Sequence, residues 1–358
     1  MPPVRNACVK FICPPQGGYP IEGQHIRYYD SEQLDTDSIE LRGGVLLRNI
    51  VVSIDPYQRG RMRDPKTKSY ASAYELNKPI FNFGVGRVIR SDNSNFKLGD
   101  EIFSSEIGYE EYTVLSEDQL RSPFIKVINL DHLPKLSYAK WLGAAGMPGF
   151  TAFYGLYEIG KPKKGETIFI SAASGAVGQV VGQLAKREGL KVIGSCGSDD
   201  KAEFLKNQLE FDHVFNYKTS KTLEELQKFG GVDIYWENVG GETLDDVLVS
   251  AKVGARIIAC GMISQYNISG EPYGVRKLTN IVSKSITMKG FIVLDKEIWN
   301  KSNSEKFYSS IPKLLDDGKI KTKEDITIGL DKSIESLIGI FKGQNFGKAL
   351  VEIWDGKN

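Results

Sequence analysis

The sequence predicts an α/β protein in which a parallel sheet, covered by helices on both faces, accompanies an antiparallel β domain. From about residue 165 the chain repeats a short apolar strand, a turn and a helix, which is the pattern of a doubly wound parallel sheet. Before about residue 128, short apolar segments alternate with Gly, Asp and Pro turn signals. This second pattern indicates antiparallel β structure such as a partly open barrel.

The individual elements follow from these two patterns. The antiparallel part is expected to contain strands at residues 43–55, 80–91, 96–105 and 109–117. In the second part, strands are expected at residues 167–171, 191–196, 213–217, 232–240, 255–261 and 285–294. The intervening helices are expected at residues 177–189, 199–208, 223–229 and 242–251. The tail after about residue 320 leaves this rhythm, and its alternating Ala349, Val351 and Ile353 predict a strand that returns to the first domain.

Length and charge exclude several classes of protein. A chain of 358 residues is long enough for two domains. Its formal net charge of +1 gives no overall field that would recruit nucleic acid or an anionic membrane. The first twenty residues lack the long apolar core of a secretory signal, and no run of about 18 apolar residues could span a bilayer. We therefore expect a cytoplasmic protein that binds neither nucleic acid nor membrane.

The cysteines and histidines are scattered, which argues against a metal site. The four cysteines form no CxxC pair and are expected to be reduced thiols: Cys8, Cys13, Cys196 and Cys260. None of the three histidines lies within four residues of another or of a cysteine: His25, His132 and His213. Because a tetrahedral zinc site needs about four N or S ligands, we expect neither a structural nor a catalytic zinc.

The turn after the strand at 167–171 has nearly the spacing of a dinucleotide-binding loop. It reads A-x-G-x-x-G, where the usual loop begins with glycine: Ala173, Ser174, Gly175, Ala176, Val177 and Gly178. Ala173 can replace the first glycine if its φ stays negative. Gly175 lets a pyrophosphate approach the backbone, and Gly178 lets the helix pack closely on the strand. A structural tight turn could also explain the glycines, but the flanking strand and helix favour a phosphate site at a helix N-terminus.

The end of the next strand bears on the choice between NAD and NADP. An acidic residue there would hold the ribose 2′-hydroxyl of NAD. Here small residues come first and leave room for a 2′-phosphate, with Ser198 followed by Asp199 and Asp200. These two acids suit the first turn of the following helix. Lys201 and Lys218 are then either phosphate partners or solvated surface charges.

Seven stretches together resemble one known family. They occur in a single order, at residues 52–62, 146–156, 170–186, 214–218, 237–242, 260–267 and 343–351. This combination is similar to the zinc-independent branch of the medium-chain dehydrogenase/reductase superfamily, which contains prostaglandin reductases and alkenal double-bond reductases. The resemblance covers nearly the whole chain. It implies a GroES-like β-barrel catalytic domain formed by residues 1–135 and 322–358, and a Rossmann NADPH-binding domain at residues 136–321.

The resemblance also implies a set of cofactor-binding residues. Lys201 and Tyr217 would contact the 2′-phosphate side, and Asn238 would lie against the central part of the cofactor. Residues 260–266 and 291–293 would line the nicotinamide side, the latter from the next strand. The complete implied NADP(H) set is Ala173, Ser174, Gly175, Ala176, Val177, Gly178, Ser198, Lys201, Tyr217, Asn238, Cys260, Gly261, Ile263, Ser264, Tyr266, Phe291, Ile292, Val293, Asn345 and Gly347. Two departures are that Glu237 stands where Asp is usual and Met262 where Ala is common.

The chemistry of such an enzyme needs a hydrogen-bond donor rather than a metal. Reducing a C=C bond conjugated to a carbonyl sends hydride to the β-carbon and places negative charge on the oxygen, which a positioned donor stabilises. By resemblance, Tyr266 is the candidate, although it could also pack in an ordinary loop. Tyr57 is the second candidate, as a wall of the substrate pocket, an orienting hydroxyl, or part of a structural turn.

The residues leave three functions open. The first is an NADPH-dependent reductase of α,β-unsaturated aldehydes and ketones. The second is a quinone or carbonyl/alcohol oxidoreductase on the same fold, and the third is an NADPH-binding protein with little catalysis. A homodimer is implied by the resemblance alone.

Overall fold

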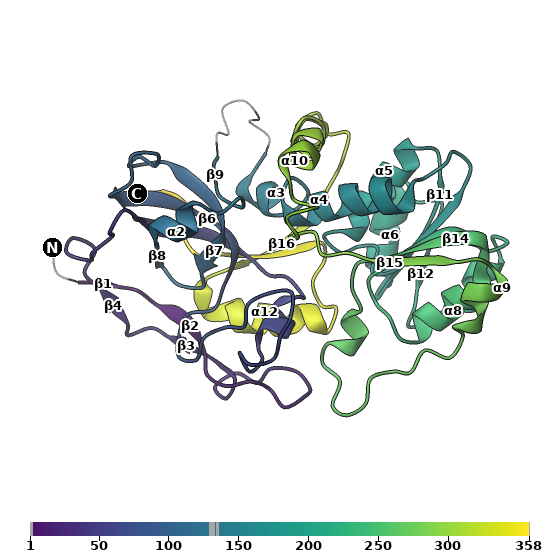
Figure 1. Ribbon diagram of the computed structural model, residues 1–358, viewed down its shortest axis with the longest axis horizontal. Coiled ribbons are helices and arrows are strands. Elements are labelled where there is room, and N and C mark those ends of the chain that lie inside the picture. The colour runs from purple at the N-terminus through teal and green to yellow at the C-terminus, as the bar shows by residue number, and fades with distance from the viewer. Residues whose placement is uncertain (1–2, 129–132, 134–135, 358) are drawn as a thin grey trace. The chain divides into compact units, whose positions relative to one another are not determined.

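The computed structural model describes residues 3–128, 133 and 136–357, and divides the chain into two compact units (Figure 1). The first unit comprises Met1–Leu142, Asp325–Asn345 and Ala349–Asn358. The second comprises Gly143–Glu324 and Phe346–Lys348. The expected boundary at residue 135 and His132 both lie outside the described residues. In the described part of the chain, no helix is long and apolar enough to cross a membrane.

The second unit is built on a six-stranded parallel sheet, which confirms the predicted doubly wound fold. Its strand order is β12-β11-β10-β13-β14-β15, so the first strand lies in the middle and the chain winds outward in both directions. The strands are β10 (Thr167–Ile170), β11 (Lys191–Cys196), β12 (His213–Asn216), β13 (Val232–Glu237), β14 (Ala251–Ala259) and β15 (Thr287–Gly290). The switch in direction between β10 and β13 is where such sheets bind ligands.

Helices cover both faces of this sheet (Figure 1). On one face α5 packs on β10 and β11, and α6 packs on β11 and β12. On the other face α7 and α8 pack together, and α8 also contacts β13 and α9. The helices are α5 (Gly178–Arg187), α6 (Asp199–Asn207), α7 (Thr222–Gln227), α8 (Glu242–Ser250) and α9 (Thr279–Ser283). Inside, the buried Phe169 ring stacks on Phe215 and Tyr235 at centroid distances of 5.8 and 5.2 Å.

The sequence did not predict several helices in the second half of the chain and just before it. A short α3 (Tyr138–Leu142) belongs to the first unit, and the second unit starts with α4 (Met147–Tyr154), which runs directly into a π-helix at Gly155–Gly160. Later in the chain, α10 (Lys301–Tyr308) packs on α4, and α11 (Ile311–Asp316) follows it. The last sheet strand is shorter than expected: β15 ends at Gly290, so residues 291–294 lie beyond it. As an edge strand, β15 has a partner on only one side.

The first unit contains a seven-stranded sheet and two small two-stranded sheets. The large sheet has the order β16-β17-β5-β6-β7-β9, with β8 also paired to β5. Its strands are β5 (Val45–Ser53), β6 (Phe81–Ser91), β7 (Glu101–Gly108), β8 (Tyr112–Leu115), β9 (Lys126–Val127), β16 (Glu324–Ile328) and β17 (Lys348–Glu352). The small sheets pair β1 (Val4–Arg5) with β4 (Gln33–Leu34), and β2 (Cys8–Phe11) with β3 (Ile26–Tyr29).

The C-terminal tail returns to this unit, as the sequence predicts. β17 pairs antiparallel with β5, with Leu350 opposite Ser53. Leu350 is as buried as its neighbours Ala349 and Val351, so the strand is apolar on both faces rather than on one. The helix α12 (Ser333–Phe341) packs beside β3 (Figure 1). Its Leu337 belongs to the same core as Phe11 and Ile26. The short helices α1 (Gln58–Arg61) and α2 (Glu117–Leu120) complete the unit.

Candidate functional site

The glycine turn connects β10 to α5, and its two glycines differ in how many backbone atoms crowd them. A Cβ on Gly178 would lie 2.7 Å from Ala172 O and Ala173 Cα, so the helix packs against the backbone of the turn. A Cβ on Gly175 would meet only Ala172 O, at 3.2 Å. Gly175 is therefore crowded by a single backbone atom, and its turn leads into the N-terminus of α5, the kind of position at which anions bind.

The strained residue of this turn is Ala172, which the glycine pattern in the sequence does not single out. Ala172 has φ 49°, in the left-handed region, whereas Ala173 is not among the residues with positive φ. Ala173 is fully buried, and its N–H donates to Ser195 O at 2.9 Å. The methyl group in place of the first glycine is thus accommodated against β11, and the unusual conformation lies one residue earlier.

The end of β11 brings together the residues expected at a 2′-phosphate. Ser198 caps α6 in an extended conformation, and a Cβ on Gly197 would lie 3.0 Å from the Tyr217 hydroxyl. Lys201 is 8% exposed, while Tyr217 is 49% exposed. Lys201 also lowers the pKa of the Cys196 thiol electrostatically, although burial dominates and raises that pKa to about 11. Lys201 therefore lies at this strand end, whereas Lys218 is exposed to solvent.

The two acidic residues after Ser198 form hydrogen bonds with neighbouring side chains. Asp199 Oδ1 accepts a hydrogen bond from Asn216 Nδ2 at 2.9 Å. A hydrogen bond from the Ser198 side chain lowers the pKa of the Asp200 carboxyl. Both residues lie in the first turn of α6, where negative charge is favourable.

Asn238 follows β13 and is tied to the start of the glycine turn. Its Nδ2 donates to Ser171 O at 2.7 Å and its backbone N–H to Ser171 Oγ at 3.0 Å, while its Oδ1 accepts from Trp236 Nε1 at 3.1 Å. Asn238 thus links the ends of two neighbouring strands. Its side chain fixes the relative positions of the glycine turn and the β13 end, and Ser171, which the sequence analysis did not select, is its partner.

Residues 260–266 form a loop that follows β14 and carries Tyr266. Ile263 N–H donates to Asn238 O at 3.0 Å, and Ser264 N–H to Val239 O at 3.1 Å. The Tyr266 hydroxyl accepts from Met262 N–H at 3.3 Å. A phenol that accepts in this way still carries its own O–H proton as a donor. Cys260 lies at the root of the loop, where burial raises its thiol pKa to about 12.

The remaining predicted residues lie beyond β15 and in the C-terminal tail. Phe291 contacts the Tyr154 and Trp236 rings, at centroid distances of 5.9 and 6.3 Å. Ile292 is half-buried and Val293 is buried. The expectation that residues 291–293 belong to a strand is wrong, because β15 ends at Gly290. Gly347 has φ 90°, and a Cβ there would lie 1.9 Å from Lys323 O. Asn345 belongs to the first unit.

Tyr57, the second candidate hydroxyl, belongs to a buried polar network in the first unit. Its hydroxyl donates to Asn82 Oδ1 at 2.5 Å. Asn82 is fully buried, and its Nδ2 donates to Ser53 O, Asp55 Oδ2 and Gln58 Oε1 at 2.9 to 3.0 Å. These three acceptors fix the orientation of the amide, so its oxygen must face Tyr57. Burial raises the pKa of Tyr57 well above its usual value, and the hydroxyl presents its lone pairs, not its proton, to any further group.

Two arginines that follow Tyr57 contact aromatic rings or backbone carbonyls of the same unit. Arg61 lies between the Tyr74 and Phe81 rings, 4.3 and 3.9 Å from their centroids, and donates to Ser72 O and Phe81 O. Arg63 donates to three backbone carbonyls. These contacts support the interpretation of the segment around Tyr57 as a structural turn.

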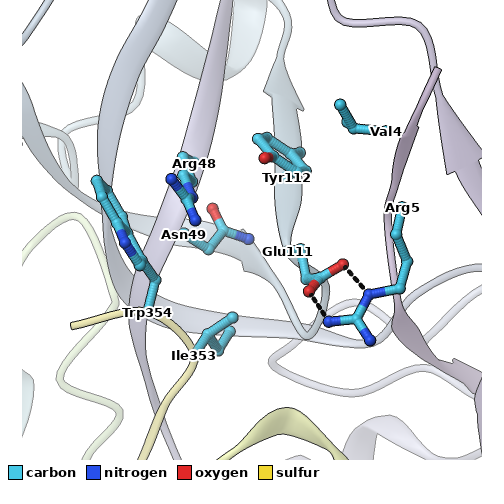
Figure 2. Close-up of a pocket in the computed structure, with 8 residues that line it drawn as sticks. All are labelled: Val4, Arg5, Arg48, Asn49, Glu111, Tyr112, Ile353 and Trp354. Atoms are coloured by element: carbon cyan, nitrogen blue, oxygen red, sulfur yellow. Dashed lines mark hydrogen bonds and ion pairs between the residues drawn. The ribbon is translucent and has the colours of Figure 1, made fainter. Parts of the chain in front are cut away.

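A pocket of about 210 Å³ lies in the first unit, away from these residues. Figure 2 shows its lining, where Arg5 is paired with Glu111 and the Arg48 guanidinium lies 4.0 Å from the centroid of the Trp354 ring. None of the predicted site residues lines it. Its volume is below the range usual for ligand pockets, so it is not a candidate for a dinucleotide. Among the residues that the structure describes, no three His, Cys, Asp or Glu side chains are grouped to hold a metal ion.

Comparisons with known proteins cover nearly the whole chain. Residues 32–122 match the family model for the N-terminal domain of oxidoreductases, and residues 176–307 match the model for zinc-binding dehydrogenases. A zinc-type alcohol dehydrogenase-like protein of Schizosaccharomyces pombe is 45% identical, over 94% of this chain and 95% of its own length. An NADP⁺-dependent 2-alkenal reductase of Nicotiana tabacum is 41% identical, over 86% of this chain and 87% of its own.

A solved structure agrees with these matches. CurA from Vibrio vulnificus in complex with NADPH superposes with a TM-score of 0.85, at 34% identity, over 97% of this chain and 99% of that one. Together with the two domain matches, this likeness confirms the predicted combination of a Rossmann sheet and a GroES-like β domain.

Proposed function

Because the chain belongs to the zinc-independent, alkenal reductase branch of the medium-chain dehydrogenase/reductase family, we propose that it uses NADPH to reduce the C=C bond of α,β-unsaturated aldehydes and ketones. The observation that carries this proposal is the position of Tyr266. Its hydroxyl lies on a loop bonded to the β13 end, and β13 is in turn bonded to the glycine turn. A tyrosine donor is thus built into the dinucleotide-binding edge of the sheet.

The second unit fits a dinucleotide by its backbone as well as by its side chains. Gly175, which has no side chain, and the N-terminus of α5 would receive the pyrophosphate, and Lys201 with Tyr217 would flank the 2′-phosphate. NADPH supplies the hydride when it is bound. The residues of this chain then have to orient the substrate carbonyl and stabilise the charge that develops on its oxygen.

Tyr266 performs this second task in the proposed mechanism. Its O–H donates a hydrogen bond to the carbonyl oxygen, and the bond strengthens as the oxygen becomes an enolate oxygen. The Met262 N–H that donates to the Tyr266 oxygen stabilises negative charge on the phenol as the proton moves. The Tyr57 hydroxyl donates to Asn82 Oδ1. Toward a substrate, Tyr57 would therefore accept a hydrogen bond or provide a wall.

The experiment that tests the function compares NADPH with NADH across alkenals, enones and quinones. We expect NADPH to be preferred about tenfold or more in kcat/KM, which corresponds to about 1.4 kcal/mol, with turnover of alkenals and enones and little of quinones. Turnover of quinones alone would favour the alternative oxidoreductase. NADPH binding without turnover of any activated alkene would favour a binding protein with little catalysis.

A substitution at Lys201 tests the preference for NADPH over NADH. Lys201→Ala is expected to weaken NADPH binding about 10- to 100-fold, since a charged hydrogen bond contributes about 1.5–3 kcal/mol, and to leave NADH binding unchanged. Lys218→Ala, an exposed lysine nearby, is the matched control and should leave both affinities as they are. Equal loss of NADPH and NADH affinity in Lys201→Ala would contradict the assignment. Fluorescence titration of each nucleotide measures these affinities.

We also propose a homodimer that uses the β15 edge of the second unit. β15 offers unpaired backbone groups, and the exposed Val253 and Val282 lie near each other because Gly254 N–H donates to Lys284 O at 2.7 Å. Val282→Glu is expected to shift sedimentation from two chains to one, while Leu98→Glu, on an equally exposed apolar residue of the first unit, should not. A single-chain mass for the unmodified protein would refute the dimer. The cytoplasmic location stays a prediction from the sequence.

A further inference from the structure

Glu237 is a buried carboxylate at the end of β13 with an unequal environment at its two oxygens. The side chain is fully buried. Its Oε1 accepts three hydrogen bonds, from Tyr235 Oη at 2.8 Å, Val239 N–H at 2.6 Å and Gly240 N–H at 2.8 Å. Its Oε2 is buried and has no hydrogen-bond partner among the described residues. Burial raises the pKa of this carboxyl.

Such a residue is unfavourable for stability. A buried polar atom without a partner costs free energy, and an apolar side chain of similar size would avoid the cost. The presence of an acid at this position is therefore best explained by the hydrogen bonds that its other oxygen, Oε1, accepts. That oxygen binds the N–H groups of a turn, Val239–Gly241, in which Gly240 and Gly241 have positive φ values of 73° and 61°.

This turn supports the loop that carries Tyr266. Val239 O accepts hydrogen bonds from Ser264 N–H at 3.1 Å and Ser264 Oγ at 2.5 Å. The two segments also pack without spare room, because a Cβ on Gly240 would lie 2.9 Å from Met262 Cβ. A shift of the Val239–Gly241 turn would therefore also displace residues 262–264.

The backbone of Glu237 holds the other end of the same loop. Its carbonyl oxygen accepts from Cys260 N–H at 3.0 Å and from Gly261 N–H at 3.1 Å. The Met262 N–H that bonds the Tyr266 hydroxyl lies directly after these residues. The main chain of Glu237 thus contacts the start of the loop directly. Its side chain acts on the middle of the loop indirectly, through the Val239–Gly241 turn.

We propose that Glu237 is a positioning residue: its Oε1 clamps the Val239–Gly241 turn, and this turn places the Cys260–Tyr266 loop and the Tyr266 hydroxyl for reaction. The proposal rests on the proposed function, since Tyr266 is the group it serves. Glu237 itself does not touch the substrate or take part in proton transfer.

The test compares Glu237→Met with Glu237→Gln, two variants of similar size of which only Gln keeps an oxygen that can accept from both N–H groups. Glu237→Met is expected to lower kcat with an enal about 10- to 100-fold, as a misplacement of about 1 Å does. Glu237→Gln should stay within about threefold of the unmodified protein, because the clamp persists without the charge. Tyr235→Phe removes a donor to Oε1 but not the clamp, and should also stay within about threefold.

Two further measurements separate positioning from unfolding and from failure of the proposed function. Tm and the dissociation constant of NADPH are measured for each variant, and Glu237→Met should lose far more kcat than NADPH affinity while remaining folded at the assay temperature. If the unmodified protein reduces no enal, the emission spectrum of bound NADPH still reports the loop, and Glu237→Met alone should alter it. Full kcat in Glu237→Met, equal loss in Glu237→Gln, or an unaltered emission spectrum in Glu237→Met would overturn the proposal. Should Glu237→Met not fold, Glu237→Ala takes its place.

Discussion

Replacement of Tyr266 by Phe is expected to lower kcat with an α,β-unsaturated aldehyde about 100-fold, the usual contribution of a positioned proton donor. The dissociation constant of NADPH should change little. The reason is local: the Phe ring can keep the same packing, and the Met262 N–H loses only its contact with the hydroxyl oxygen. Stopped-flow reduction of one enal by saturating NADPH measures the effect.

The control for this variant is Tyr157→Phe. The Tyr157 hydroxyl bonds Glu188 at 2.8 Å on the surface of the same unit, so its loss should leave kcat unchanged. A Tyr266→Phe protein with unaltered kcat would show that another group polarises the carbonyl. A large rise in the NADPH dissociation constant would instead make Tyr266 part of the cofactor site alone.

Replacement of Gly178 by Ala is expected to destabilise the protein by about 3 kcal/mol, at the upper end of what overpacking costs. The new methyl group would overlap Ala172 O, Ala173 Cα and Ala173 O, at 2.7 to 2.8 Å, and all three are backbone atoms that cannot rotate away. To admit it, α5 must move from β10, which also displaces the N–H groups that would face a phosphate. Urea unfolding followed by circular dichroism, with NADPH titration beside it, measures both effects.

Substitutions at two other glycines serve as controls for Gly178→Ala. Gly274→Ala places its methyl group in open space and should leave stability and NADPH affinity unaltered. Gly175→Ala meets only Ala172 O, at 3.2 Å, so stability should fall by less than about 1 kcal/mol while NADPH binding weakens. If Gly178→Ala were as stable as Gly274→Ala, the close packing of α5 on the turn would be refuted.

The fold could be predicted because its signals are local. Each strand and helix of the parallel sheet has its own periodicity, and the order of strands follows from right-handed crossovers. The end of β15 was less predictable, because an edge strand depends on pairing with a single neighbour, here β14. The helices between residues 138 and 160 were missed, since glycines at 143, 146, 149 and 155 read as turn residues there.

The site residues that belong to a short motif could be predicted from the sequence. Those whose hydrogen-bond partners are distant in the sequence could not. The positions of Gly175 and Gly178 follow from a six-residue pattern, and the structure gives them different amounts of space, as expected. The left-handed Ala172 and the clamp made by Glu237 could not be foreseen, because both depend on neighbouring strands. Asn82 bonds residues 24 to 29 positions earlier in the chain. The one available signal was the unusual Glu237 itself, where the resembling family has Asp.

The return of β17 to the first unit has a consequence for the order in which the protein forms during its synthesis. β17 occupies the edge of β5 at Val51–Ser53, yet it is the last strand to leave the ribosome. The β domain, which begins the chain, must therefore wait with that edge of β5 uncovered until residues 348–352 have emerged. The parallel sheet is continuous from residue 167 to residue 290 and has no such wait. The parallel sheet of the second unit can therefore form before the large sheet of the first unit is complete.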